Sequence, residues 1–105
     1  MKAPDRLESD KQAVDDQVLV MRGQGRSFGR IAEAVGLTRA SQANAAFNRA
    51  LRRRPAKEMA AIRSEENSRL DRLAASVRSD GSQSEADLER RLGVVEKLRA
   101  RLMRD

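Results

Sequence analysis

The apolar side chains of this chain recur at three- and four-residue spacings, and nowhere do they alternate with polar ones over a useful length. The clearest case is Phe28, Ile31, Ala32 and Val35, whose spacing places all four on one face of a helix. Strands need period-two runs rich in β-branched and aromatic residues, and only 2% of this chain is aromatic. The sequence therefore predicts an all-α protein.

Residues that commonly begin or end helices divide this pattern into five segments. Ser27 and Ser41 are predicted N-caps, and Ser82 with Glu85 has the spacing of a capping box. Gly36 is predicted to end the second helix, because glycine tolerates the left-handed conformation found there. The predicted helices cover about residues 9–22, 27–35, 41–53, 55–79 and 82–102, after a disordered arm over residues 1–8.

The positive charge is concentrated in one segment. Residues 20–54 contain eight arginines and one glutamate, so they carry a net charge of +7, whereas the whole chain carries +6. A localised basic excess is typical of a surface that binds a polyanion such as nucleic acid.

Other functions lack the residues that they need. The chain has no Cys and no His, which removes disulfides, thiolate metal sites and the commonest general base. Asp15-Asp16 and Glu65-Glu66 are adjacent pairs, and adjacent side chains on a helix point in different directions rather than converging on a metal. We expect no enzymatic activity, cofactor, metal or small-molecule substrate. No apolar run approaches a membrane span and no secretory signal is visible, so a cytoplasmic location is expected.

The segment over residues 27–41 predicts a helix-turn-helix. Ala32 is small where a second helix would cross closely, and Gly36 follows four residues later at the turn. Ile31, Val35 and Leu37 would hold the two helices together. An ordinary three-helix core, in which the same residues serve packing alone, is the alternative.

The third predicted helix would then read DNA in the major groove. Side-chain amides pair with adenine and arginine pairs with guanine, while other arginines bind phosphates. For each single residue, the alternative is a solvated side chain without a ligand. Expected at base edges are Arg39, Gln42, Asn44, Ala45 and Asn48, and expected at phosphates are Arg26, Arg30, Arg49, Arg52 and Arg53.

Residues 55–105 are predicted to form a helical hairpin or coiled coil that assembles subunits, while residues 9–54 form the DNA-binding domain. The apolar stripe of the last helix alternates steps of four and three, as in a heptad repeat. Neither stripe is wide enough for a stable free hairpin, so self-association is expected. The predicted assembly residues are Leu70, Leu73, Val77, Leu88, Leu92, Val95, Leu98 and Leu102.

Three stretches resemble small helix-turn-helix proteins of actinobacterial phages and prophages, many of which look like small terminase subunits. They are Gly-Arg-Ile-Ala-Glu-Ala-Val-Gly at residues 29–36, Ala-Leu-Arg-Arg at 50–53, and Glu-Glu-Asn-Ser-Arg-Leu-Asp-Arg-Leu at 65–73. The resemblance implies a homo-oligomer in the bacterial host cell that binds double-stranded viral DNA. It also implies a partner, a large terminase subunit whose ATPase and nuclease package the genome.

Two other functions remain open from the sequence. A dimeric transcription regulator or nucleoid-associated protein would need the same head, with two copies reading half-sites about one helical turn apart. A purely structural helical protein would need no basic segment.

Overall fold

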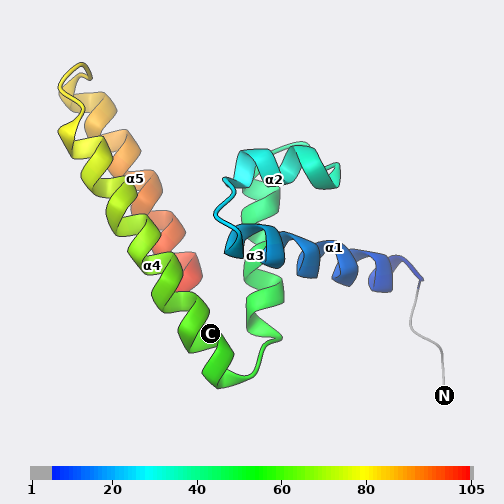
Figure 1. Cartoon of the computed structure of the whole chain (residues 1–105). Helices are drawn as coiled ribbons and strands as arrows, with labels where there is room; N and C mark the ends of the chain where they lie inside the picture. The colour runs from blue at the N-terminus through cyan, green and yellow to red at the C-terminus, as the bar shows by residue number, and fades with distance from the viewer. Residues whose placement is uncertain (1–5, 105) are drawn as a thin grey trace. The chain divides into compact units, whose positions relative to one another are not determined.

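The computed structural model describes residues 6–104, and every regular element in that range is an α-helix (Figure 1). The prediction of an all-α protein is confirmed. The chain divides into two compact units between Arg54 and Pro55. The helices are α1 (Arg6–Gly23), α2 (Phe28–Val35), α3 (Ala40–Arg52), α4 (Ala56–Ser79) and α5 (Glu85–Leu102).

The disordered arm predicted for residues 1–8 is only partly open to comparison. Residues 1–5 lie outside the described residues, and residues 6–8 belong to α1. The first helix therefore begins about three residues earlier than predicted. Leu7 lies seven residues before Val14, so the helical apolar spacing extends to this turn, although the prediction began at Ser9.

In the first unit, α1 and α2 both pack against α3. Val18 of α1 and Ile31 of α2 are fully buried, as are Phe47 and Leu51 of α3. Ala43, Ala46 and Ala50 are buried on the same helix, and their small side chains allow the neighbouring helices to approach closely. The ring of Phe47 is therefore the one fully buried aromatic side chain among the described residues, and small alanines surround it on α3.

An aromatic and cationic cluster connects the end of α1 to the start of α2. The rings of Phe28 and Phe47 meet edge to face, with centroids 5.6 Å apart and planes at 65°. The guanidinium of Arg22 lies 4.1 Å from the Phe28 centroid, and its Nη1 donates to the Arg26 carbonyl at 2.9 Å. Arg22 thus has a structural role at the junction of these helices.

The ends of α2 are as predicted. The Ser27 hydroxyl accepts a hydrogen bond from the Arg30 backbone N–H at 3.2 Å, and Gly36 adopts the left-handed conformation with φ 79°. The backbone N–H of Leu37 donates to the Ala32 carbonyl at 2.8 Å. A short turn therefore leads directly from α2 towards α3.

The predicted N-cap of α3 is wrong by two residues. The helix begins at Ala40 with Arg39 as N-cap, so Ser41 lies inside the first turn. The reason is Gln42, whose side-chain oxygen accepts from the backbone N–H groups of Thr38 and Arg39 at 2.8 and 3.1 Å. These bonds satisfy amides that a helix start otherwise leaves without a partner.

The second unit is a hairpin in which α4 and α5 pack against each other. Its buried apolar residues are Leu70, Ala74, Val77, Val95 and Leu102. The predicted capping box at Ser82 is wrong, because Ser84 is the N-cap of α5 and accepts from the Asp87 backbone N–H at 3.2 Å. Ser82 instead donates its hydroxyl proton to Asp80 at 2.6 Å, within the turn.

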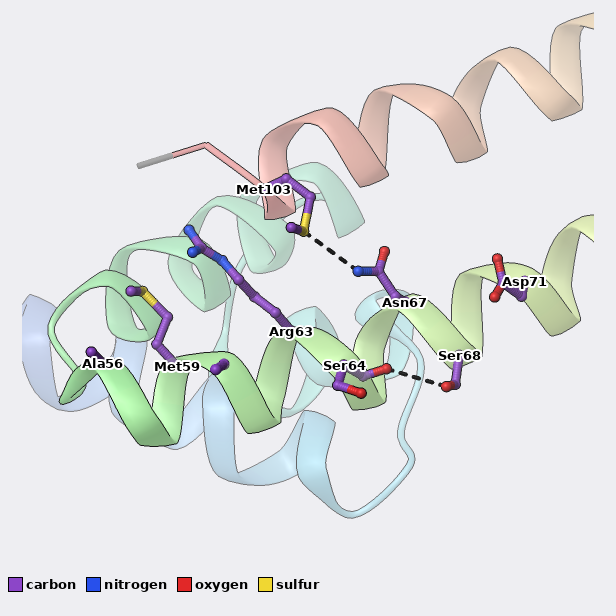
Figure 2. Close-up of a pocket in the computed structure, with 9 residues that line it drawn as sticks. Ala56, Met59, Arg63, Ser64, Asn67, Ser68, Asp71 and Met103 are labelled. Carbon is purple, nitrogen blue, oxygen red and sulfur yellow. Dashed lines mark hydrogen bonds between the residues drawn. The ribbon is translucent and has the colours of Figure 1, made fainter.

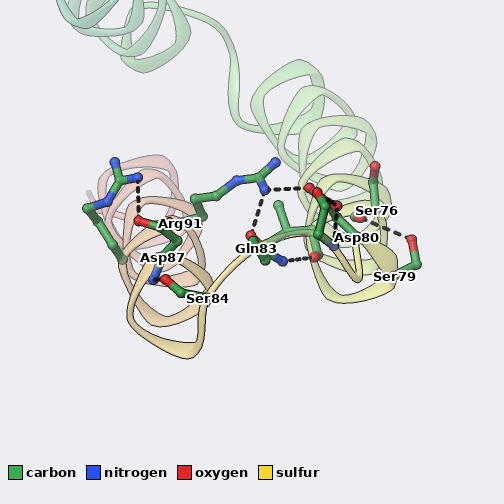
Figure 3. Close-up of polar contacts among 10 residues, drawn as sticks. Ser76, Ser79, Asp80, Gln83, Ser84, Asp87 and Arg91 are labelled. Carbon is green, nitrogen blue, oxygen red and sulfur yellow. Dashed lines mark hydrogen bonds and ion pairs between the residues drawn. The ribbon is translucent and has the colours of Figure 1, made fainter.

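Polar contacts hold the hairpin at both of its ends. Near the turn, Arg91 of α5 donates to Asp80 at 3.2 Å and to the Gln83 side-chain oxygen at 2.6 Å (Figure 3). At the other end, Arg63 of α4 donates to the carbonyls of Leu102 and Arg104 at 2.9 and 2.7 Å. A cation at the last carbonyls of a helix is favoured by the helix dipole.

Candidate functional site

The exposed side of α3 carries fewer of the predicted DNA contacts than expected. Gln42, Ala45 and Arg52 are exposed, and Arg49 lies partly exposed on the same side. The opposite side is buried against α1 and α2. Because α3 packs against two helices, its buried arc is wider than the apolar stripe that the sequence shows.

The prediction that Asn44 and Asn48 face outward is wrong. Only 5% of Asn44 and 4% of Asn48 is exposed. They precede the buried Leu51 by seven and three residues, so all three lie on the same side of the helix. The side-chain nitrogen of Asn48 donates to the Asn44 carbonyl at 3.1 Å and to its side-chain oxygen at 3.3 Å. These amides hydrogen-bond with each other inside the unit, so neither presents a base-reading edge at the surface.

Gln42 is exposed, but half of its amide is already used. Its oxygen caps α3, as described above, which leaves the Nε2 group for contact with a ligand. Arg39, the N-cap residue, is exposed beside it. The start of α3 therefore offers hydrogen-bond donors rather than the donor and acceptor pair that adenine requires.

Two of the predicted phosphate ligands are engaged by α1. Arg49 forms a two-pronged ion pair with Asp15, from Nε to Oδ2 and from Nη2 to Oδ1, both at 2.9 Å. Arg53 lies farther away, with Nη2 at 3.4 Å from Asp15 and 3.5 Å from Asp16. The hydrogen bonds to Asp15 raise the pKa of the Arg49 guanidinium above its ordinary value.

Sequence reasoning assigned no role to Asp15, although it is among the most deeply buried charged residues in the part of the chain that the structure describes. The one available signal was its position in α1. Asp15 lies one turn from the buried Val18, on the apolar side of the helix. A buried carboxylate requires a cationic partner, and Arg49 of α3 and Arg53, the C-cap of that helix, supply it.

The remaining predicted phosphate ligands are accessible. Arg26 and Arg30 are exposed at the start of α2, where they line an open hollow of about 490 Å³ together with Glu33 and Ala34. Arg52 is exposed at the end of α3, and Arg39, which was predicted at a base edge, is exposed immediately before the start of that helix. Four of the arginines predicted to contact DNA are therefore exposed on α2 and α3 or just before these helices, namely Arg26, Arg30, Arg39 and Arg52.

The predicted assembly residues fall into three groups by burial. Leu70, Val77, Val95 and Leu102 are buried within the hairpin itself, while Leu88, Leu92 and Leu98 are half-buried. The exposed fraction is 45% for Leu73 and 52% for Val94, and Val94 was not part of the predicted heptad pattern. These two residues line a mainly apolar hollow of about 190 Å³ with Val77, Val95 and Arg91.

A second hollow of the hairpin is more polar. It measures about 560 Å³ and is lined mostly by α4, with Met103 from the end of the chain (Figure 2). Asn67 donates to the Met103 sulfur at 3.4 Å, and Arg99 donates to Asn67 and Asp71 at 2.8 and 2.7 Å. These hydrogen bonds join the C-terminal part of the chain to α4, so the polar side chains of this hollow stabilise the hairpin.

No group of three His, Cys, Asp or Glu residues within residues 6–104 is arranged to hold a metal ion. None of the helices in this range combines the length and apolarity needed to cross a bilayer.

Comparisons with protein-family models, with curated proteins and with solved structures find no match to this chain.

Proposed function

We propose that this protein is a non-enzymatic binding protein for double-stranded DNA, and that its first unit is the DNA-binding part. The observation that carries the proposal is the net positive charge of residues 20–54, which contain eight arginines and one glutamate. Arg26, Arg30, Arg39 and Arg52 are all exposed. Such a surface binds the phosphate backbone, with an affinity that falls as salt rises.

Within this proposal, α2 and α3 act as a helix-turn-helix, with α3 as the recognition helix. The short turn at the left-handed Gly36 and the burial of Ala32 against the unit support this assignment. We assign Arg26, Arg30 and Arg52 to phosphates, and we move Arg39 from a base edge to a phosphate because it precedes α3 as its N-cap. The Gln42 Nε2 group and the Ala45 methyl group are assigned to base edges, because both are exposed on α3.

The second unit is proposed to assemble copies of the chain through the exposed pair Leu73 and Val94. Exposed apolar residues that line a shared hollow favour contact with another apolar surface. A multimeric DNA-binding adaptor, similar to a small terminase subunit, combines these two properties and presents viral DNA to a large terminase motor. The resemblance of residues 29–36, 50–53 and 65–73 supports this role.

A dimeric transcription regulator or nucleoid-associated protein is the second candidate. It is supported by the exposed pair Leu73 and Val94, because a twofold dimer can be built from one self-complementary patch, whereas a ring needs two different surfaces on each copy.

Light scattering on the full chain, with and without duplex DNA, separates the two roles. A closed ring of many subunits supports the adaptor, whereas a dimer that remains a dimer on DNA supports the regulator. A mass that stays monomeric at all concentrations would overturn the assembly proposal.

Fluorescence anisotropy with a labelled duplex tests DNA binding itself. Arg52→Ala should weaken binding to every duplex and reduce the slope of log affinity against log salt by about one. Arg72→Ala is the matched control, because it removes an exposed arginine of α4 outside the basic segment. Equal losses in the two variants would contradict a localised interface, and absence of wild-type binding at low salt would overturn the proposal.

A further inference from the structure

We infer that Asp15 is a positioning residue, which holds Arg49 so that the outer edge of its guanidinium binds a pair of hydrogen-bond acceptors on duplex DNA. The inference rests on the proposed function, since it names a contact within that interface. The acceptor pair is chemically defined: two phosphate oxygens, or the O6 and N7 atoms of guanine.

The geometry of the ion pair leaves one edge of Arg49 available. A guanidinium has five N–H donors arranged on a planar fork. Asp15 accepts from Nε and from Nη2, both at 2.9 Å, and so occupies the side edge. The donors that Asp15 does not use are one N–H of Nη2 and both of Nη1. Two of these are nearly parallel, which is the arrangement that two adjacent acceptors require.

Burial differs sharply between the two partners. The Asp15 side chain is 2% exposed, whereas the Arg49 side chain is 40% exposed. The carboxylate is therefore enclosed on the protein side, while the guanidinium reaches solvent. An arginine held in this way loses less conformational entropy when it binds than one that is free to rotate.

Arg49 also lies in the right place on α3. Ala45 precedes it by four residues and Arg52 follows by three, so the three side chains share one side of the helix. Both neighbours are exposed. The guanidinium thus lies in the middle of the surface that the proposed function assigns to DNA.

The charges of this cluster make the inference easy to test. Asp15, Asp16, Arg49 and Arg53 together carry no net charge, so attraction between net charges gives no reason for DNA to bind there. By Coulomb's law alone, removing a carboxylate should strengthen binding to a polyanion. If Asp15 positions Arg49, Asp15→Asn should instead weaken DNA binding, because it removes the pair of carboxylate oxygens that orients Arg49. The asparagine oxygen can accept from only one of the two arginine nitrogens, and its NH₂ group opposes the other donor.

The experiment compares Asp15→Asn with Asp16→Asn by anisotropy on one duplex, in the wild type and in an Arg49→Ala background. Asp16 is the matched control because it is an adjacent, exposed carboxylate that makes no contact with Arg49 in the described structure. We expect Asp15→Asn to bind about tenfold more weakly than the wild type. Asp16→Asn should bind equally or more tightly. In the Arg49→Ala background, Asp15→Asn should cause no further loss.

Two results would overturn the inference while leaving the proposed function intact. One is wild-type or tighter binding by Asp15→Asn, and the other is a loss that persists without Arg49, which indicates a purely structural role. Circular dichroism checks that each variant is folded at the assay temperature. If Asp15→Asn is not folded, Arg49→Lys is used to test the inference, since lysine keeps the positive charge beside Asp15 but lacks the planar set of donors. An unchanged affinity of Arg49→Lys then overturns the inference.

The source of the acceptors follows from the same data. Equal losses on all duplexes, with a smaller salt slope, support a phosphate. A loss confined to duplexes with guanine at one position supports the base edge. Absence of any wild-type binding would instead overturn the proposed function, and the inference with it.

Discussion

The side-chain oxygen of Gln42 accepts a hydrogen bond from the backbone N–H of Arg39, at 3.1 Å, across the first turn of α3. The same oxygen accepts from Thr38 at 2.8 Å. Arg39 has no side-chain acceptor with which to cap the helix itself. A residue predicted to read a base is therefore also the residue that determines where the recognition helix of the proposed interface begins.

Gln42→Ala should destabilise the first unit by about 1 kcal/mol, because two backbone amides at the start of α3 lose their acceptor. Gln42→Glu keeps the oxygen and adds a negative charge at a helix start, so it should be at least as stable as the wild type. Urea denaturation followed by circular dichroism measures both. Equal losses in the two variants would contradict the capping role.

Gly36→Ala should destabilise the protein by about 1–2 kcal/mol, since Gly36 has φ 79° and an L side chain is strained in that conformation. Gly29→Ala is the matched control. Gly29 lies within α2, and an added methyl group there meets no atom within 4 Å. It should raise stability by up to about 1 kcal/mol through helix propensity. Denaturation midpoints that fall equally in both variants would show that the turn conformation does not matter.

The Asp80 carboxylate should make the hairpin more stable at neutral than at acid pH. Hydrogen bonds from Ser82 and then from Arg91 hold the pKa of Asp80 below its ordinary value of 3.8. A carboxyl whose pKa is lower in the folded state stabilises that state above the unfolded pKa, and this contribution is lost as pH falls through the folded pKa. Melting temperatures of the wild type and of Ser82→Ala, measured from neutral to acid pH, test this pH dependence. The variant should lose part of the pH dependence, and superimposable pH profiles would rule out the Ser82 contribution.

Leu73→Glu and Val94→Glu should lower the native mass of the assembly, because each places a charge on the exposed apolar hollow of the hairpin. Ala75→Glu is the control, since Ala75 is exposed on α4 and does not line that hollow. Light scattering measures the mass, and circular dichroism verifies the helix content. A mass that is unchanged in the Leu73 and Val94 variants would place the assembly surface elsewhere.

The features that the sequence predicted correctly are those set by neighbours along the chain. The all-α class and the start and end of α2 depend on apolar spacing, a serine hydroxyl and a left-handed glycine, and each acts within about one turn. The errors at Ser41 and Ser82 are also local. In each case, a nearby side chain, Gln42 or Ser84, supplied a competing cap.

Tertiary packing decided the rest of the candidate site. Asn44 and Asn48 are buried because α3 packs against two helices, and no periodicity along α3 shows how many partners a helix has. Asp15 and Arg49 are 34 residues apart, so only the packing of α1 against α3 could reveal their ion pair. Leu70 and Val95 were predicted as assembly residues and are buried where α4 packs against α5, because an apolar stripe fits a neighbour in the same chain as well as one in another. Sequence spacing determined which side of a helix is apolar, and only the fold determined which surface covers it.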